Sequence, residues 1–132
     1  MSVAVIAQMI GNANSTERKR LDLGPGDHVV RVLRVRRDSN RPHNCEMIVL
    51  PLGRFPGLPL DREIVSDIID LARLHGVTLG TATERLRTAR ASRCVAGLLG
   101  LRRGARVRRI DRITRSADGL PLEWRIAYLA RS

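Results

Sequence analysis

The chain repeats one pattern of residues at a constant spacing. The segment that begins at Leu21 returns at Leu99, 78 positions later, with the same order of apolar residues, glycine and arginine. The matched pairs are Leu21/Leu99, Leu23/Leu101, Gly26/Gly104, Val29/Val107, Arg31/Arg109, Val32/Ile110, Arg34/Arg112 and Val35/Ile113. Two copies are too few for a solenoid, which needs roughly three or more. The repeat therefore predicts two half-modules related by a pseudo-two-fold axis, with a ligand site where they meet.

Local patterns divide each copy into a strand, a short helix and a hairpin. Asn14 and Glu17 have the spacing of a capping box, which predicts a helix from there to Leu21. Runs of alternating or β-branched residues predict strands, and Gly/Pro clusters predict the turns. The predicted strands cover 3–10, 29–37, 45–50, 77–88, 107–115 and 122–130. The other predicted helices cover 89–99 and a linking helix over 63–75, with Asp61 as its N-cap.

This order of elements predicts an α+β fold. Six strands with three helices between them favour a mostly antiparallel sheet that is covered on one face. The stretch 51–59 contains three prolines and two glycines, which predicts a connection without regular structure. A length of 132 residues predicts that 1–132 form one domain with its own core.

Composition limits the classes of function that the chain can have. The net charge of +11 is typical of nucleic-acid binders, but Lys19 is the only lysine and the arginines are spread along the chain rather than gathered in a stripe. No stretch approaches the roughly 18 apolar residues of a membrane span, so no membrane partner is expected. Two cysteines predict free thiols in a cytoplasmic protein. Neither metal-ligand spacing nor a nucleophile with its base is present, so no metal, cofactor or catalytic residue is predicted.

Three stretches of the chain, taken in order, resemble one known family. They are LP…FPGL over 50–58, GVTL…ATERLRTARA over 76–91, and AGLLGLRRG…IDR…DGLPLE over 96–123. Together with the internal repeat they resemble the UTRA domain, the effector-binding half of HutC-type regulators in the GntR superfamily of bacterial transcription factors. The resemblance covers essentially the whole chain.

The resemblance implies a chorismate-lyase-like fold that acts as a sensor rather than as an enzyme. UTRA domains bind sugar phosphates, amino-acid catabolites and similar small anions, and they usually form homodimers. They relay occupancy to a winged-helix DNA-binding domain. No helix-turn-helix pattern precedes Val3. Any DNA contact of that kind is therefore expected through a domain outside these 132 residues.

Arginines at equivalent positions of the repeat are the first candidates for ligand binding. Arg34 and Arg112 each fall on the first strand of a predicted hairpin. A guanidinium group donates two parallel hydrogen bonds to a carboxylate or phosphate. Arg36 shares the face of Arg34 by the two-residue period of a strand. The alternative for all three is a solvated arginine or an ion pair.

Four further residues are candidates for contact with a ligand. Glu84 lies where the family tends to place an acidic or amide residue toward the pocket, or it forms a cross-strand ion pair. Glu46 is a weaker candidate of the same kind. Ser66 lies near the start of the linking helix, where a hydroxyl can help hold an anion, or it is a surface serine. Tyr128 closes the pocket or packs in the core, and Trp124 is expected to pack.

The sequence thus leaves three functions to compare. The first is a ligand-sensing module that binds a small anionic metabolite between its two halves. The second is a chorismate-lyase-like enzyme on the same fold, because fold alone does not decide function. The third is a basic domain that binds nucleic acid directly.

Overall fold

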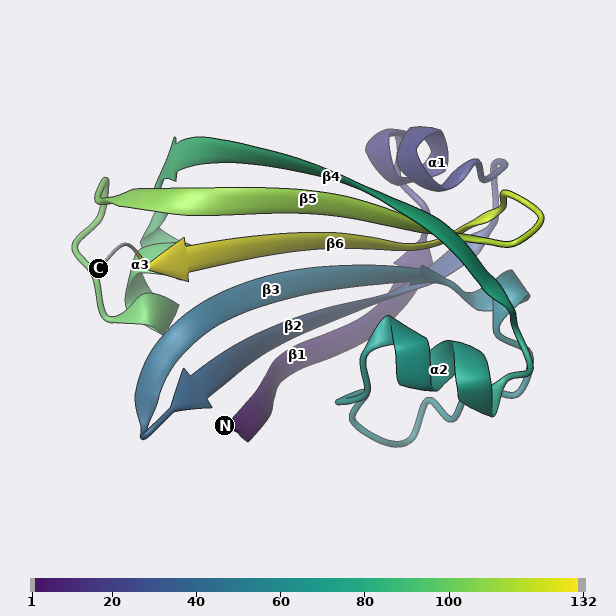
Figure 1. Cartoon of the computed structure of the whole chain (residues 1–132), viewed down its shortest axis with the longest axis horizontal. Helices are drawn as coiled ribbons and strands as arrows, with labels where there is room; N and C mark the ends of the chain where they lie inside the picture. Colours follow the sequence, from purple (N-terminus) through teal and green to yellow (C-terminus); the bar gives the residue numbers. More distant parts are fainter. Residues whose placement is uncertain (1, 131–132) are drawn as a thin grey trace.

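The computed structural model describes residues 2–130 as one twisted antiparallel sheet with helices on both of its faces (Figure 1). The strands are β1 (Ser2–Asn12), β2 (His28–Asp38), β3 (Arg41–Pro51), β4 (Leu79–Arg90), β5 (Arg106–Ser116) and β6 (Pro121–Ala130). The helices are α1 (Ser15–Leu21), α2 (Ile68–Leu74), α3 (Arg93–Leu99) and a 3-10 turn over Leu52–Arg54. The predicted α+β class is confirmed.

The order of the strands in the sheet shows the repeat directly. It runs β1-β2-β3-β6-β5-β4, and every neighbouring pair is antiparallel. The first half supplies β1, β2 and β3, and the second half supplies β4, β5 and β6, so the two halves meet where β3 pairs with β6 (Figure 1). The pseudo-two-fold axis that the repeat predicts passes through this β3–β6 junction.

The equivalence of the halves extends to how each helix begins and ends. Asn14 caps α1 and Ser92 caps α3, each accepting from a backbone N–H three residues on. Each helix is followed by a left-handed residue, Asp22 at φ 54° and Gly100 at φ 68°. Glycine suits this conformation, and aspartate is one of the few other residues that adopt it; the Asp22 backbone N–H donates to Arg18 O.

The halves differ in their hairpin turns. The first hairpin closes with Asp38 paired to Arg41, while the second uses the longer turn between Ser116 and Pro121. The extra length displaces the returning strand by one residue. As a result Arg34 lies opposite Glu46, whereas its equivalent Arg112 lies opposite Arg125. The two halves therefore have the same order of strands and helices but place different charged side chains at the junction.

Both faces of the sheet are covered, which corrects the prediction of a single covered face. On one face Leu21 of α1 packs with Val29, Val49 and Trp124, and α3 packs against the same face at the other end of the strands. On the other face the connection after β3 and helix α2 form a separate core. Its buried members are Val30, Val32, Ile48, Leu50, Phe55, Ile64, Ile68, Leu71 and Leu122. Neighbouring residues of one strand enter different cores because strand side chains alternate between faces.

The linking helix is shorter than predicted. It covers Ile68–Leu74 instead of 63–75, and Asp67 rather than Asp61 accepts from the backbone at its start. The backbone of the preceding residues is used elsewhere. Ile64 N–H donates to the Gln8 side chain at 2.9 Å, and its carbonyl accepts from Arg34 at 3.1 Å. Contacts distant in sequence thus replace the helical hydrogen bonds that the apolar period suggests.

Other predicted boundaries change as well: the strand predicted over 45–50 is Arg41–Pro51, and the one predicted over 77–88 is Leu79–Arg90. The helix predicted over 89–99 is Arg93–Leu99, because β4 continues to Arg90 and Ala91 N–H then donates to Ala105 O at 2.7 Å. Ser92 is the N-cap that limits it. The connection predicted to lack regular structure contains the 3-10 turn over Leu52–Arg54.

Cys45 is buried, Cys94 is exposed, and both are free thiols. Burial raises the pKa of Cys45 to about 11. Within residues 2–130 no helix is long and apolar enough to cross a membrane.

Two glycines have opposite expected responses to alanine. A Cβ on Gly80 of β4 would lie 2.5 Å from the Ser116 carbonyl oxygen, whereas a Cβ on Gly97 of α3 would meet nothing within 4 Å. We expect Gly80→Ala to lower the free energy of unfolding by about 1–3 kcal/mol, because backbone must move. We expect Gly97→Ala to raise it by about 0.5–1 kcal/mol. Urea unfolding of both variants measures this, and equal shifts would contradict the packing of β4 against the second turn.

Candidate functional site

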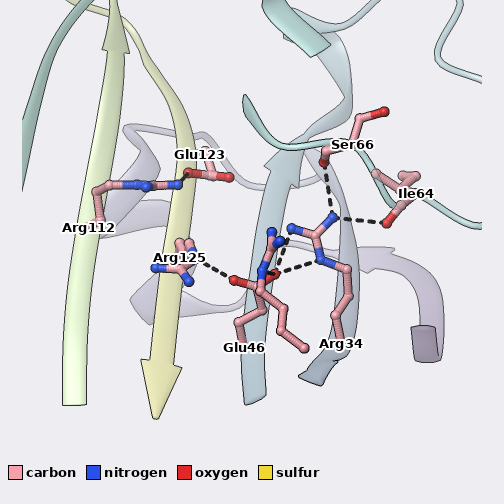
Figure 2. A network of polar contacts seen from close by, with 8 residues as sticks. Arg34, Glu46, Ile64, Ser66, Arg112, Glu123 and Arg125 are labelled. Atoms are coloured by element: carbon pink, nitrogen blue, oxygen red, sulfur yellow. Dashed lines mark hydrogen bonds and ion pairs between the residues drawn. The ribbon is translucent and has the colours of Figure 1, made fainter. Parts of the chain in front are cut away.

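A group of charged side chains spans the β3–β6 junction on the face that α2 covers in part. Four arginines and two glutamates belong to it, and we call them the arginine–glutamate cluster. Figure 2 shows how Arg34, Glu46, Arg112, Glu123 and Arg125 lie relative to one another. The members are Arg34, Arg36, Glu46, Arg112, Glu123 and Arg125. The first three come from the first half of the repeat and the last three from the second.

Arg34 is a fully buried cation held on both sides. Its side chain is 1% exposed, and it donates to Glu46 Oε1 from Nε at 2.9 Å, with Nη2 at 2.8 Å from the same oxygen. Its Nη1 donates to the carbonyls of Ile64 at 3.1 Å and Ser66 at 3.0 Å (Figure 2). Burial lowers the pKa of Arg34, and the charge of Glu46 opposes that shift. The connection before α2 is therefore fastened to the sheet through this guanidinium.

Glu46 is the centre of the first part of the cluster. Oε1 also accepts from Arg36 Nε at 3.2 Å, and Oε2 accepts from Arg125 Nε at 2.5 Å. Burial favours the neutral acid, but the charges of Arg125 and Arg34 outweigh it and lower the pKa of Glu46. Glu46 is thus ionised, and its bond to Arg125 is the ion pair that crosses from one half to the other.

A second pair lies one strand further on. Arg112 Nη2 donates to Glu123 Oε1 at 2.8 Å, and the Glu123 side chain is 1% exposed. Here burial prevails over the attraction of Arg112, and the pKa of Glu123 is raised. Two carboxylates of one cluster therefore have opposite shifts, because Glu46 faces three arginines and Glu123 is bonded to one.

The second half of this face also holds polar atoms without partners. Among residues 2–130, three buried side-chain atoms make no hydrogen bond. They are Arg112 Nε, Thr114 Oγ1 and, at the far end of the face, Asn44 Oδ1. Buried polar groups are normally paired, because an unpaired one has lost its bonds to water. Arg112 Nε–H and the Thr114 hydroxyl are donors, and an anion that accepts hydrogen bonds beside the guanidinium groups would satisfy them, whereas Asn44 Oδ1 is itself an acceptor.

Of the predicted site residues, the structure brings Arg34, Arg36, Glu46 and Arg112 into this cluster. Ser66 reaches it through its backbone carbonyl. Glu84 is exposed and lies opposite Arg112 on β4, on the same face, although the ion pair of Arg112 is with Glu123.

Tyr128 lies on the other face of the sheet, apart from the cluster. It pairs in register with Cys45 and packs against the α3 core, and its hydroxyl accepts from Arg109 Nη1 at 3.2 Å. Trp124 shares that face and is 8% exposed, which confirms its predicted packing role.

Glu123 and Arg125 were missed by the sequence reasoning. The signal that identifies them is period two along the last strand. With Trp124 and Tyr128 packed inward on one face, Glu123 and Arg125 must point to the other. Charged residues at alternate positions of a central strand indicate a built polar cluster.

The cluster can bind an anion but does not resemble a metal centre. Four guanidinium groups face two carboxylates, so positive charge is in excess on a partly buried surface. In the part of the chain that the structure describes, no three His, Cys, Asp or Glu side chains are grouped to hold a metal ion.

Comparison with known proteins agrees with this architecture. The family model of the UTRA domain matches residues 1–132. A GntR-family transcriptional regulator from Enterococcus faecalis is 23% identical with a TM-score of 0.90, covering 98% of this chain and 93% of that one. The ligand-binding domain of a GntR-family regulator from Bordetella bronchiseptica is 25% identical with a TM-score of 0.89, over 99% and 84% of the two chains. The effector domain of PhnF from Mycobacterium smegmatis is 20% identical with a TM-score of 0.87, over 96% and 78%.

Proposed function

Because the chain belongs to the UTRA domain family, we propose that it is the ligand-sensing and dimerisation module of a HutC-type GntR regulator in the bacterial cytoplasm. Its ligand is a small anionic metabolite that binds at the arginine–glutamate cluster. The observation that carries this proposal is the convergence of four arginines from both halves of the repeat on one partly covered face.

The charge balance of the cluster favours an anion. With both carboxylates ionised the cluster has two positive charges in excess, and burial of Glu123 favours loss of its negative charge. Arg36 and Arg112 are the two arginines best placed to meet a ligand, since each side chain is 23% exposed. A carboxylate or phosphate bound there accepts charge-assisted hydrogen bonds in a water-poor surrounding, where they are strong.

The position of the cluster connects binding with regulation. Arg34 and Arg36 belong to the first half, while Arg112 and Arg125 belong to the second. A ligand that contacts both groups favours one arrangement of the halves over another. By linkage, the same preference changes the spacing of winged-helix domains attached outside these 132 residues.

The homodimer is proposed on the exposure of β4. Ten of its twelve residues are exposed, among them Leu86 at 64%, and it forms one edge of the sheet. An exposed edge strand offers unpaired backbone groups to another chain. Light scattering on the purified chain should give twice the 14.7 kDa of one copy. A mass of one copy over the micromolar range would contradict the dimer.

A thermal-shift screen tests the sensor. Sugar phosphates, phosphonates, amino acids and their catabolites are added to the purified chain, and one class of anion should raise Tm in a concentration-dependent way. Arg36→Ala and Arg112→Ala should abolish most of the shift, whereas Arg62→Ala, which removes an exposed arginine that is not a member of the cluster, should keep it. A chorismate turnover assay on the same sample addresses the enzyme alternative, and pyruvate release would contradict a pure sensor.

The opposite pKa shifts in the cluster predict opposite responses to pH. The stabilising contribution of Glu46 is complete above its unfolded pKa of about 4.3 and is lost as pH falls below it, since its folded pKa is lowered. The contribution of Glu123 is complete below about pH 4.3 and is lost as pH rises through its raised folded pKa.

In Glu123→Gln, the free energy of unfolding should therefore rise more steeply with pH above about pH 4.3 than in the wild type. In Glu46→Gln, the free energy of unfolding should fall less steeply as pH is lowered below about 4.3. Urea unfolding at a series of pH values measures both slopes. Equal changes in the two variants would show that the carboxylates do not differ in environment.

A further inference from the structure

A second group of arginines lies on the opposite face of the sheet, between α1 and the edge strand β4. Arg20 comes from α1, Arg85 and Arg87 from β4, and Arg109 from β5; with Asp111 they line a hollow of about 160 Å³. We call these four arginines and Asp111 the basic hollow. Pairing in register places Arg87 beside Arg109 and Arg85 beside Asp111, on the face of α1 and α3. The sheet therefore separates the basic hollow from the arginine–glutamate cluster.

The only carboxylate of the basic hollow is already engaged. Asp111 accepts from Arg109 at 2.8 Å and 3.0 Å and from Trp124 Nε1 at 3.3 Å. The bonds from Arg109 outweigh burial and lower the pKa of Asp111, so this carboxylate is ionised. Arg20, Arg85 and Arg87 form no ion pair with any residue in 2–130. Three positive charges therefore converge without an anion to balance them.

The guanidinium groups of the basic hollow repel one another, and neighbouring side chains hold two of them in place. Arg87 and Arg109 are directly opposite each other on paired strands, a position in which like charges destabilise a sheet. The guanidinium carbon of Arg20 lies 5.7 Å from the centre of the Trp124 ring, and that of Arg109 lies 5.7 Å from the Tyr128 ring. Two aromatic rings and one carboxylate thus orient two of the four guanidinium groups before any ligand arrives.

We propose that the basic hollow is a second anion site, which binds a phosphate group between α1 and β4. A phosphate presents several oxygens at once, and arginine forks match that geometry better than point charges do. None of the described residues that line the hollow is aromatic, and the rings of Trp124 and Tyr128 are stacked against Arg20 and Arg109, so recognition is of the phosphate itself. The source is either a free phosphate or a phosphate of a nucleic-acid backbone.

Titration with inorganic phosphate at low ionic strength tests the site on the full chain. Amide and arginine Nε–H signals in ¹⁵N NMR spectra report where the anion binds, and those of Arg20, Arg85 and Arg87 should shift. We expect Arg85→Ala/Arg87→Ala to raise the Kd for phosphate at these signals about tenfold or more, since it removes two charge-assisted donors. Arg62→Ala changes an exposed arginine near the other face and should leave that Kd unchanged.

The variants also separate this site from the arginine–glutamate cluster. Arg36→Ala should leave phosphate binding at the basic hollow intact, whatever it does to an effector. Phosphate-induced shifts confined to Arg36 and Arg112 would overturn the proposal, and so would a Kd unaffected by Arg85→Ala/Arg87→Ala. Both side chains are exposed, so the double variant is expected to fold, and circular dichroism checks this.

A duplex DNA fragment of unrelated sequence distinguishes the source. If the phosphate comes from nucleic acid, the duplex binds more tightly than inorganic phosphate and its affinity falls steeply as the salt concentration rises. Arg85→Ala/Arg87→Ala then reduces the slope of log affinity against log salt concentration by about two. If the source is free phosphate, the duplex does not compete with it. Failure of both probes to reach Arg20, Arg85 and Arg87 would overturn the site.

Discussion

Glu46→Gln should lower the free energy of unfolding by about 3–5 kcal/mol. The carboxylate is fully buried, and three arginines depend on it: Arg34, which is itself 1% exposed, Arg36 and Arg125. Removing its charge leaves a buried guanidinium uncompensated, which is far more unfavourable than losing a surface ion pair. Urea unfolding at pH 7 measures the loss.

Glu84→Gln is the matched control for that experiment. It removes the same charge from an exposed position on the same face, and a change within about 0.5 kcal/mol is expected. Equal effects of the two substitutions would show that the Glu46 network contributes nothing beyond general charge. A large effect of Glu46→Gln alone would establish that the junction between the halves is fixed by this carboxylate.

Phe55→Ala should be comparably severe, with a loss of about 3–5 kcal/mol. Phe55 is 1% exposed and anchors the connection after β3 in the core beneath α2. Its ring lies edge-on to the His75 ring, with 5.8 Å between the two ring centroids. The same connection brings the carbonyls of Ile64 and Ser66 to Arg34. Loosening the anchor therefore acts on the cluster as well as on the core.

Leu60→Ala provides the comparison within the same connection. Leu60 is 41% exposed, and its truncation should cost about 0.5–1 kcal/mol. Hydrogen exchange at the amide of Ile64, which donates to Gln8, reports the effect on the connection. This amide should exchange faster in Phe55→Ala than in Leu60→Ala, and identical rates in the two variants would show that the connection at the cluster is independent of the Phe55 core.

The constant spacing of 78 residues predicted much of the fold. It predicted two halves with a strand, a short helix and a hairpin in each, because the Leu21 and Gly26 positions recur at Leu99 and Gly104. That the halves join by pairing β3 with β6 is a finding of the structure. The start of α2 was not predictable in this way. Ile64, Ile68 and Leu71 follow a helical period, but the backbone near Ile64 bonds to Gln8 and Arg34, which are far away in sequence.

The site was predictable to a smaller extent, because its make-up depends on register. Arg34 and Arg112 are equivalent in the repeat, yet the longer second turn sets Arg125 opposite Arg112 instead of Trp124, the residue equivalent to Glu46. No local pattern reveals that displacement. The face of Tyr128, in contrast, follows from period two once Trp124 is assigned to packing, and the same count places Arg125 with the cluster.

We propose that Arg112 and its neighbours bind a small anion across the junction of the halves. Isothermal titration of the metabolite that raises Tm most, into the wild-type chain and into Arg112→Ala, measures this binding. We predict a Kd about tenfold higher or more in Arg112→Ala, with Arg62→Ala unchanged, because a charge-assisted hydrogen bond is lost. The same Kd in all three proteins would show that the ligand does not bind at Arg112.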